Sequence, residues 1–224
     1  MASPKVTALP TTPAPPILPR SLQPMTLREA LGEALTTQSD VEGKHFTDDA
    51  FTDSHIDVLE FSGCLFERCT FTVLPFKRLF FVDCCFSHCD FSGAKLENTT
   101  FQRVLWQESR LTGCDFIKAS LSNASFLSCT ADLIGFADTK LAKVAFTQCR
   151  LRESLWQNIR HKDVIMDACD LTSAQLSDMP MAGMNMTTCV LEGIKISLAD
   201  LRGMAVTALQ GVQLCRLFGL KIIE

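Results

Sequence analysis

The chain has 224 residues, and its 25 acidic against 21 basic side chains give a net charge of −4. No apolar run approaches the ~18 residues that a transmembrane helix needs, so we expect no membrane span. Eleven cysteines, with no charged-then-apolar segment at the N-terminus, indicate a reducing environment and predict a cytoplasmic protein.

Residues 1–24 contain most of the nine prolines, chiefly within "LPTTPAPPILPRSLQP". Proline fixes φ and cannot donate a backbone hydrogen bond, so this composition predicts an extended, mobile tail. In the simpler interpretation the tail is a linker or a capping arm. In the other it is a PxxP-type ligand for a partner.

Residues 25–45 are predicted to form an N-terminal capping helix and a lead-in. Thr26 and Glu29 have the spacing of a capping box. The apolar residues after Thr26 share one helical face, and they are Leu27, Ala30, Leu31, Ala34 and Leu35. Such a helix would cover the first edge of the repeat that follows, since an open edge can template aggregation.

From Phe46 to Val206 every fifth residue is a large apolar side chain, and only Ala131 and His161 interrupt the series. A period of five fits neither a helix nor an ordinary strand and indicates an internal repeat. The position two residues earlier holds a smaller apolar or polar side chain. Both positions are buried together only if the chain turns after every unit, so that four units make one square coil.

Nine of the eleven cysteines occupy the small inward position, and four of them are spaced by 20 residues: Cys129, Cys149, Cys169 and Cys189. Short spacings between cysteines suggest zinc binding. However, a linear column of thiols on one wall cannot form a tetrahedral site. We therefore interpret these cysteines as small buried side chains and predict neither a metal nor a cofactor.

Units such as "CDFSG", "AKLEN" and "ADLRG" resemble the pentapeptide-repeat family, whose unit is approximately A-D/N-L-x-x. The resemblance covers residues 46–206. It implies an all-β fold, a right-handed quadrilateral β-helix, with short capping helices at the N- and C-terminal ends. Twenty residues per coil give about eight coils and a rod on the order of 40 Å long, at ~4.8 Å per coil.

The two interruptions of the series carry separate expectations. We expect Leu133 to fill the gap that Ala131 leaves in the core. His161 is either a functional switch or the site of a local bulge, through which its ring reaches water or a backbone carbonyl.

Residues 207–224 abandon the period of five. The apolar spacing predicts an amphipathic helix that ends at Gly219, followed by a short strand over "LKII". This segment either folds back on the last coil or pairs with a second copy in an isologous dimer. We favour the homodimer, and its predicted interface is Leu209, Val212, Leu214, Leu217, Phe218, Leu220 and Ile222.

The stretches "CTADLIGF", "ACDLT" and "DLRGMAVTALQGVQLCRLFGLKI" resemble the quinolone-resistance (Qnr) branch of the family, especially its chromosomal Gram-positive members. The resemblance implies a tail-to-tail dimer that imitates duplex DNA, binds DNA gyrase or topoisomerase IV and protects them from quinolones. Plasmid-borne Gram-negative members carry protective loops. The unbroken period of five predicts no such insertion between residues 46 and 206.

Outward charges are divided unevenly among the four walls of the predicted coil. Two adjacent walls each have a net charge of −3, the third is balanced and the fourth is +2. Duplex DNA carries one charge per ~1.7 Å, so the imitation would be dilute. The predicted partner-binding acids on the two negative walls are Glu67, Asp90, Glu108, Asp132, Glu153, Asp167, Asp170 and Glu192.

Two functions remain compatible with the sequence. The first is protection of a type II topoisomerase, in which reversing the charge of Asp132, Glu153 and Asp170 should abolish the effect. The second is a general interaction scaffold with an unrelated protein. The charge distribution argues against direct nucleic-acid binding, which needs a strongly basic face. It is equally compatible with a role in solubility alone.

Catalysis is not expected. The four histidines (His45, His55, His88 and His161) and the scattered acids show no triad spacing, phosphate loop or metal-ligand set. A convex rod also lacks the concavity that a small-molecule substrate requires.

Overall fold

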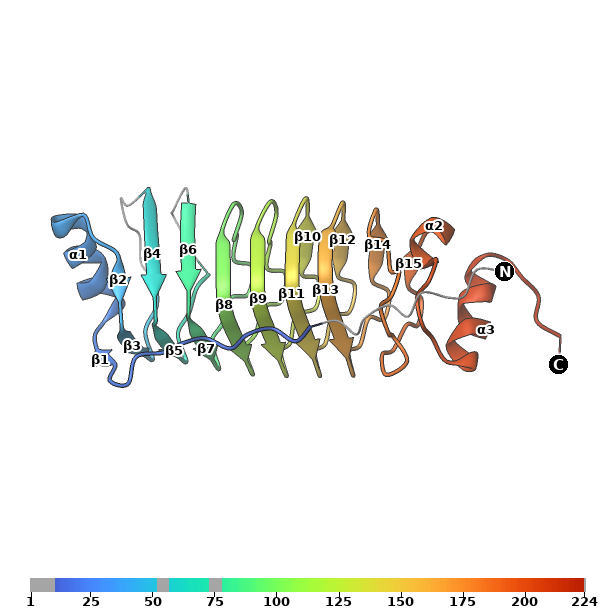
Figure 1. Ribbon diagram of the computed structural model, residues 1–224, viewed down its shortest axis with the longest axis horizontal. Coiled ribbons are helices and arrows are strands. Elements are labelled where there is room, and N and C mark those ends of the chain that lie inside the picture. The colour runs from blue at the N-terminus through green and yellow to red at the C-terminus, as the bar shows by residue number, and fades with distance from the viewer. Residues whose placement is uncertain (1–10, 52–56, 73–77, 224) are drawn as a thin grey trace.

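The computed structural model describes residues 11–51, 57–72 and 78–223, which form a straight rod of stacked coils with a helix at each end (Figure 1). The predicted core positions Ile56 and Phe76 lie outside these residues. Within the described part, the helices are α1 (Leu27–Thr37), α2 (Leu198–Leu201) and α3 (Ala208–Leu217).

The strands of the described residues are short, and all their pairings are parallel. They are β1 (Gln23–Pro24), β2 (Val41–Glu42), β3 (Lys44–Thr47), β4 (Val58–Ser62), β5 (Leu65–Glu67), β6 (Arg78–Val82), β7 (Cys85–Ser87), β8 (Thr100–Gln107), β9 (Ser120–Leu127), β10 (Gly135–Ala137), β11 (Lys140–Thr147), β12 (Leu155–Gln157), β13 (Arg160–Asp167), β14 (Gln175–Ser177) and β15 (Lys195–Ile196).

Strand pairing confirms a coil of twenty residues. Phe46 pairs with Phe66, and the same offset of 20 continues along every paired strand to β13. Each coil therefore has four walls, defined by the core residues they carry. The first wall carries Phe46, the second Phe51, the third Leu96 and the fourth Phe61, each with its partners at multiples of 20. The fold is the predicted quadrilateral β-helix.

Corners between walls require an unusual backbone. Two residues after most of the core positions φ is positive, as at Asp48 (52°), Asp83 (53°) and Glu153 (54°). A left-handed conformation costs least for Gly, Asn and Asp. The period of five therefore reflects a turn at every fifth residue as well as a buried side chain.

The core contains stacks of aromatic rings from successive coils. Along the first wall, Phe66 stacks on Phe86 at 4.9 Å between ring centroids, and Trp106 stacks on Phe126 at 4.5 Å. After Trp156 the buried large side chains are Met, Leu and Ile in place of rings. The rod thus changes from an aromatic to an aliphatic core along its length.

Several of the small inward positions hold Cys, Ser or Thr side chains that donate hydrogen bonds. Cys149 lies 3.3 Å from the carbonyl oxygen of Phe126, and Ser109 and Thr139 make the equivalent contact with Phe86 and Phe116. Each acceptor is the carbonyl group of the core residue 23 positions earlier, in the preceding coil. Buried carbonyl groups need such partners, so the cysteines are weak donors as well as space-fillers.

Helix α1 closes the N-terminal end. Thr26 and Glu29 form the predicted capping box, and the backbone N–H of Leu27 donates to Asp49 of the first coil at 2.5 Å. Leu27 and Leu31 are buried against the coil. The expectation that Leu35 shares this face is wrong, because its side chain is 50% exposed.

Helices α2 and α3 close the other end. The Gln210 side chain of α3 donates to the carbonyl oxygens of Met186 (2.8 Å) and Cys189 (2.7 Å), which belong to the last coil. Leu214 packs beside it and is buried. The predicted helix is present and Gly219 follows its last turn, but no strand forms over residues 220–223.

Both interruptions of the core differ from expectation. Leu133 does not fill the gap at Ala131: it is 57% exposed because it occupies a corner with φ of 59°. His161 contacts the backbone carbonyl of Pro180 at 2.6 Å, as one interpretation predicted. However, the coil does not bulge, since His161 keeps its register with Leu141 in the pairing of β13 with β11.

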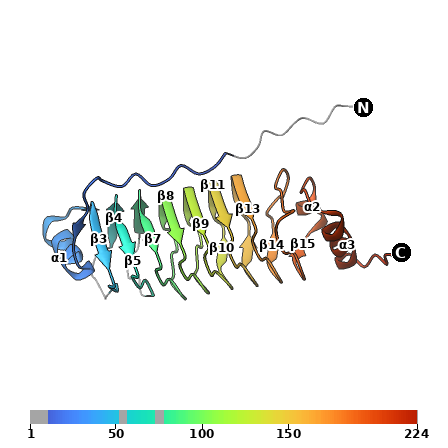
Figure 2. The same ribbon diagram turned by 90° about the horizontal axis from the view of Figure 1, so that it is seen from below.

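The Pro-rich segment is extended, as predicted, but its described part does not project from the rod. Residues 11–22 run back from β1 along the corner between the fourth and first walls, toward the C-terminal end (Figure 2). This part is hydrogen-bonded to three coils, and the predicted mobility of the tail stays a prediction.

Candidate interaction surfaces

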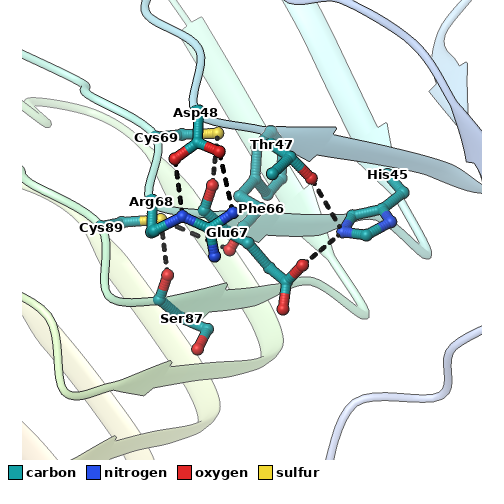
Figure 3. Close-up of polar contacts among 9 residues, drawn as sticks. All are labelled: His45, Thr47, Asp48, Phe66, Glu67, Arg68, Cys69, Ser87 and Cys89. Atoms are coloured by element: carbon teal, nitrogen blue, oxygen red, sulfur yellow. Dashed lines mark hydrogen bonds and ion pairs between the residues drawn. The ribbon is translucent and has the colours of Figure 1, made fainter.

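The predicted acidic residues lie on the outer faces of the first and second walls, where parallel stacking brings residues 20 apart side by side. On the first wall, Asp48 accepts two hydrogen bonds from the guanidinium of Arg68, at 2.6 and 2.8 Å (Figure 3). This contact lowers the pKa of Asp48. Arg68, the one base counted on the first wall, is thus paired with Asp48.

Histidines approach two further acids of the first wall. Glu67 lies 2.7 Å from Nε2 of His45, which also contacts the hydroxyl of Thr47 (Figure 3). Glu108 lies 3.7 Å from Nδ1 of His88. The third acid, Asp167, accepts a hydrogen bond from the hydroxyl of Thr188 at 2.9 Å.

Arginines pair with three of the five predicted acids of the second wall. Three contacts join Asp90 to Arg110 (3.4 Å), Asp132 to Arg150 (2.7 Å) and Asp170 to Arg152 (2.6 Å). Partial burial opposes ionisation of Asp170, but hydrogen bonds from Thr172 and Arg152 lower its pKa overall. The second wall is therefore a ladder of ion pairs, which are individually weak at a surface.

Only two of the eight predicted acids, Glu153 and Glu192, make no side-chain hydrogen bond or ion pair with any described residue. Both are exposed on the second wall, two coils apart. They are the strongest candidates for contact with a basic partner, since no internal cation competes for them.

The C-terminal end presents an apolar surface. Leu209 is 71% exposed, Leu217 45% and Leu220 57%, while Phe218 and Ile222 are also exposed and Val212 is half-buried. An apolar groove of about 390 Å³ lies between α2 and α3 and is lined by Leu198, Leu201, Leu214, Cys215, Phe218 and Leu220. Six of the seven predicted interface residues are thus accessible, and the seventh, Leu214, forms the floor of the groove.

Two cysteines of the second-wall column, Cys149 and Cys169, have a raised pKa. A hydrogen bond with Cys129 is the main cause that raises the pKa of Cys149 to about 12, and a hydrogen bond with Cys149 does the same for Cys169. Protonated thiols are poor nucleophiles and poor metal ligands. Among the described residues, no group of three His, Cys, Asp or Glu side chains could hold a metal ion.

The family is decided by the repeat itself. Residues 59–136 and 99–176 match the model of the pentapeptide repeat region, and together these matches cover more than half of the chain. The chain belongs to the pentapeptide-repeat family. Proteins of this family are in general structural or interaction proteins, and no curated protein matches the chain.

Several solved structures are similar to this pentapeptide-repeat protein. A trypsin-treated variant of QnrB1, a plasmid-mediated fluoroquinolone resistance protein, has 23% identity over 82% of this chain and 90% of its own, with a TM-score of 0.39. Full-length QnrB1 has 17% identity over 89% and 97%, with a TM-score of 0.35. HetL from the cyanobacterium Nostoc sp. strain PCC 7120 has 15% identity over 80% and 96%, with a TM-score of 0.26.

The matches thus include the Qnr proteins that the repeat sequence resembles. The predicted closeness to chromosomal Gram-positive members stays a prediction. In the described part of the pentapeptide-repeat chain, no helix has the length and apolarity that crossing a bilayer requires.

Two features of the surface were missed in the sequence. The ion pairs of the walls were readable, because an acid and a base 20 residues apart, such as Asp48 and Arg68 or Asp83 and Arg103, must lie side by side once the coil length is known. The position of the Pro-rich segment carried no such signal in the period of five.

Proposed function

We propose that this pentapeptide-repeat protein is a cytoplasmic DNA mimic that binds a type II topoisomerase, DNA gyrase or topoisomerase IV, and protects it from quinolone-type inhibitors. The observation that carries the proposal is a straight convex rod whose two adjacent walls are net negative and whose fourth wall is net positive. Such sidedness favours a protein partner with a basic groove, such as one that holds DNA.

The ion pairs refine how the rod would engage that groove. Four acids on the first two walls already pair with an arginine of the chain: Asp48, Asp90, Asp132 and Asp170. A partner would gain most from Glu153 and Glu192, whose carboxylates are open. It would gain less from Asp132 and Asp170, since their arginines would have to be displaced.

The proposed organisation assigns one role to each segment. Residues 25–45 close the N-terminal end, residues 46–206 form the rod, residues 207–224 form the dimer contact, and residues 1–24 are an accessory arm. The exposed apolar side chains of α3 and the groove beside them support a homodimer, because an apolar patch of this kind usually marks an interface. Two rods joined by this contact would present a longer set of acidic walls.

A gyrase supercoiling assay with ciprofloxacin tests the proposal. The full-length protein is titrated with and without the drug, and recovery of supercoiling in the presence of the drug is the expected result. Inhibition without recovery would mean that the rod occupies the DNA site but does not protect. No effect on either reaction would contradict topoisomerase binding.

A matched pair of charge reversals tests the electrostatic mechanism. Glu153→Lys reverses an open carboxylate of the second wall, and Glu97→Lys reverses an exposed carboxylate of the balanced third wall. We expect Glu153→Lys to weaken protection about 10-fold, since like charges at an interface cost over 1 kcal/mol, and Glu97→Lys to leave it unchanged. Equal effects would show that net charge alone matters.

A non-catalytic interaction scaffold with an unrelated partner is the second candidate. The observation that favours it is the continuous 20-residue register of the paired strands, which leaves no room within them for protective loops. It predicts no effect on supercoiling and a partner that is recovered by affinity capture and lost with Glu153→Lys.

A further inference from the structure

One corner of the rod, between the fourth and first walls, has an alternating composition. Its column runs from Gly63 through Asp83, Arg103, Asn123, Lys143 and Asp163, one residue per coil. A short side chain with an oxygen acceptor therefore appears at every second coil, and a long cation appears between. Every residue of the column has a positive φ and lies outside the core. The turn therefore constrains all six positions in the same way, and the period of five does not explain the alternation.

The arm, residues 11–19, uses these acceptors in order. The N–H of Ile17 donates to Asp83 (2.9 Å), the N–H of Ala14 donates to Asn123 (3.1 Å), and the hydroxyl of Thr11 donates to Asp163 (2.9 Å). Each step of three residues along the arm thus advances by two coils, or forty residues, of the rod. The arm runs antiparallel to the direction in which the coils are stacked (Figure 2).

The spacing of these contacts matches a polyproline II helix. Three residues of polyproline II make one turn and advance ~9.3 Å. Two coils of parallel strands advance ~9.6 Å. One face of the arm therefore meets the column at every second coil, where the acceptors lie, and skips the coils of Arg103 and Lys143.

The sequence of the arm is suited to this position. Between Pro13 and Pro19 the backbone N–H groups belong only to Ala14, Ile17 and Leu18, and two of the three donate to the column. The Ile17 side chain is 69% exposed, so its backbone rather than its side chain makes the contact. Prolines hold the remaining residues in the extended conformation at low entropic cost.

The start of the column is shaped to admit the arm. A Cβ atom at Gly63 would approach Cδ of Pro19 to 3.0 Å, and one at Gly43 would approach its Cγ to 3.6 Å. The acceptor at the next coil is also fixed: Arg103 holds both carboxylate oxygens of Asp83 at 2.6 Å. The hydrogen bond from Arg103, followed by the bond from Ile17, lowers the pKa of Asp83, which stays a charged acceptor.

We propose that the column of Asp83, Asn123 and Asp163 is a binding site for a polyproline II segment, and that its occupant is residues 11–19 of the same chain. The arm ties together coils that are otherwise joined only to their neighbours. It also covers the corner between the fourth and first walls, so the open carboxylates of the second wall stay accessible to a partner.

Residue-resolved hydrogen exchange on the full-length protein tests this site. Only Thr11, Thr12, Ala14, Ile17 and Leu18 carry exchangeable amides in the arm. Because hydrogen-bonded amides exchange more slowly, we expect the amides of Ala14 and Ile17 to exchange on the order of 10-fold more slowly than those of Thr12 and Leu18. Equal, fast exchange at all of them would overturn the proposal.

Two matched pairs of variants locate the contact. Ala14→Pro keeps the polyproline II conformation and removes one donor, whereas Thr12→Pro adds a proline where no hydrogen bond is present among the described contacts. Asn123→Gly removes the acceptor, and Asn98→Gly makes the same change at another corner with φ of 57°. We expect faster exchange of the Ile17 amide in Ala14→Pro and Asn123→Gly, and no change in the two controls.

The dependence on protein concentration identifies the occupant. Protection of Ala14 and Ile17 that is constant over a wide dilution series supports binding within one chain. Protection that disappears on dilution would assign the site to the arm of a second copy and would overturn the intramolecular assignment. Faster exchange in the control variants as well would show that the arm is held by some other contact.

Discussion

A helix covers the exposed coil at each end of the rod, but the two helices differ in what they leave exposed. Each end carries a helix with a capping box, Thr26 with Glu29 at one end and Thr207 with Gln210 at the other. Helix α1 buries Leu27 and Leu31 and leaves few apolar residues outside. Helix α3 docks through Gln210 and Leu214 but leaves its other face apolar and exposed.

This difference shows that a helix can cover a terminal coil and still leave an apolar face exposed to solvent. Both helices cover a terminal coil: α1 donates its Leu27 N–H to the Asp49 carboxylate, and α3 donates from Gln210 to two backbone carbonyl oxygens of the last coil. Only α3 retains an apolar face and groove, which one chain in water has no reason to keep. The N-terminal end is therefore a closed cap, and the C-terminal end is a cap that also serves as our proposed interface.

The largest effect is expected from the closed end. Leu31→Ala removes a buried side chain from the contact of α1 with the first coil and should lower the free energy of unfolding by about 2–4 kcal/mol. Leu35→Ala, at an exposed position of the same helix, should stay within about 0.5 kcal/mol. Urea unfolding measures both, and a similar loss in the two variants would contradict the burial assigned to α1.

The proposed interface gives the next effect. Leu217→Asp places a charge on the exposed face of α3 and should weaken the dimer on the order of 100-fold, as expected for an interface residue. Leu35→Asp is the matched control, because Leu35 has a similar exposure on the opposite helix. Sedimentation over a range of concentrations measures the dimer affinity. A wild-type protein that is monomeric at every concentration would contradict the proposed interface.

A smaller effect is expected from the polar anchor of α3. Gln210→Ala removes the donor to the carbonyl oxygens of Met186 and Cys189 and should cost about 1–3 kcal/mol. Gln213→Ala, at an exposed position of α3, should have little effect. Hydrogen exchange of the last coil checks this prediction. Unchanged exchange in Gln210→Ala would show that Leu214 alone holds the helix.

The smallest expected difference between the two ends is in how acidic pH affects the stability of each capping box. Hydrogen bonds from the Thr26 backbone and hydroxyl lower the pKa of Glu29 from its ordinary 4.5. Because the folded pKa is below the unfolded one, its contribution is present above pH 4.5 and disappears as the pH falls through the folded value. Gln210 does not titrate.

We therefore expect acid to weaken the N-terminal cap and to spare the C-terminal cap. The urea midpoint is compared between the wild type and Glu29→Gln at neutral pH and well below pH 4.5. Glu29→Gln should lower the midpoint at neutral pH only. A constant difference between the two proteins at both pH values would mean that the charge of Glu29 contributes nothing.

Much of the rod could be predicted because its constraints are local and repeated. A turn at every fifth residue and a coil of twenty residues follow from the positions of Phe46, Phe66 and their successors. Ala131 and His161 were harder, because a single break in a periodic pattern does not say how neighbouring coils adjust. Leu133 was placed wrongly for this reason.

The surface was less predictable than the core. Counting charges per wall identified two negative walls but ignored pairing, since Asp132 and Asp170 reach arginines 18 residues away in a neighbouring coil of the same wall. The burial of Leu214 also depends on how α3 rests on the last coil, which an amphipathic pattern alone does not specify.

The sequence by itself determined the coil length, the aromatic core and the presence of a helix at each end, because each follows from spacing along the chain. Only the tertiary structure decided which carboxylates remain open, which face of α3 stays exposed and where residues 11–19 lie. These depend on contacts between segments far apart in sequence. The contact of Ala14 with Asn123 follows from the agreement between two helical pitches, and that agreement exists only when the coils are stacked.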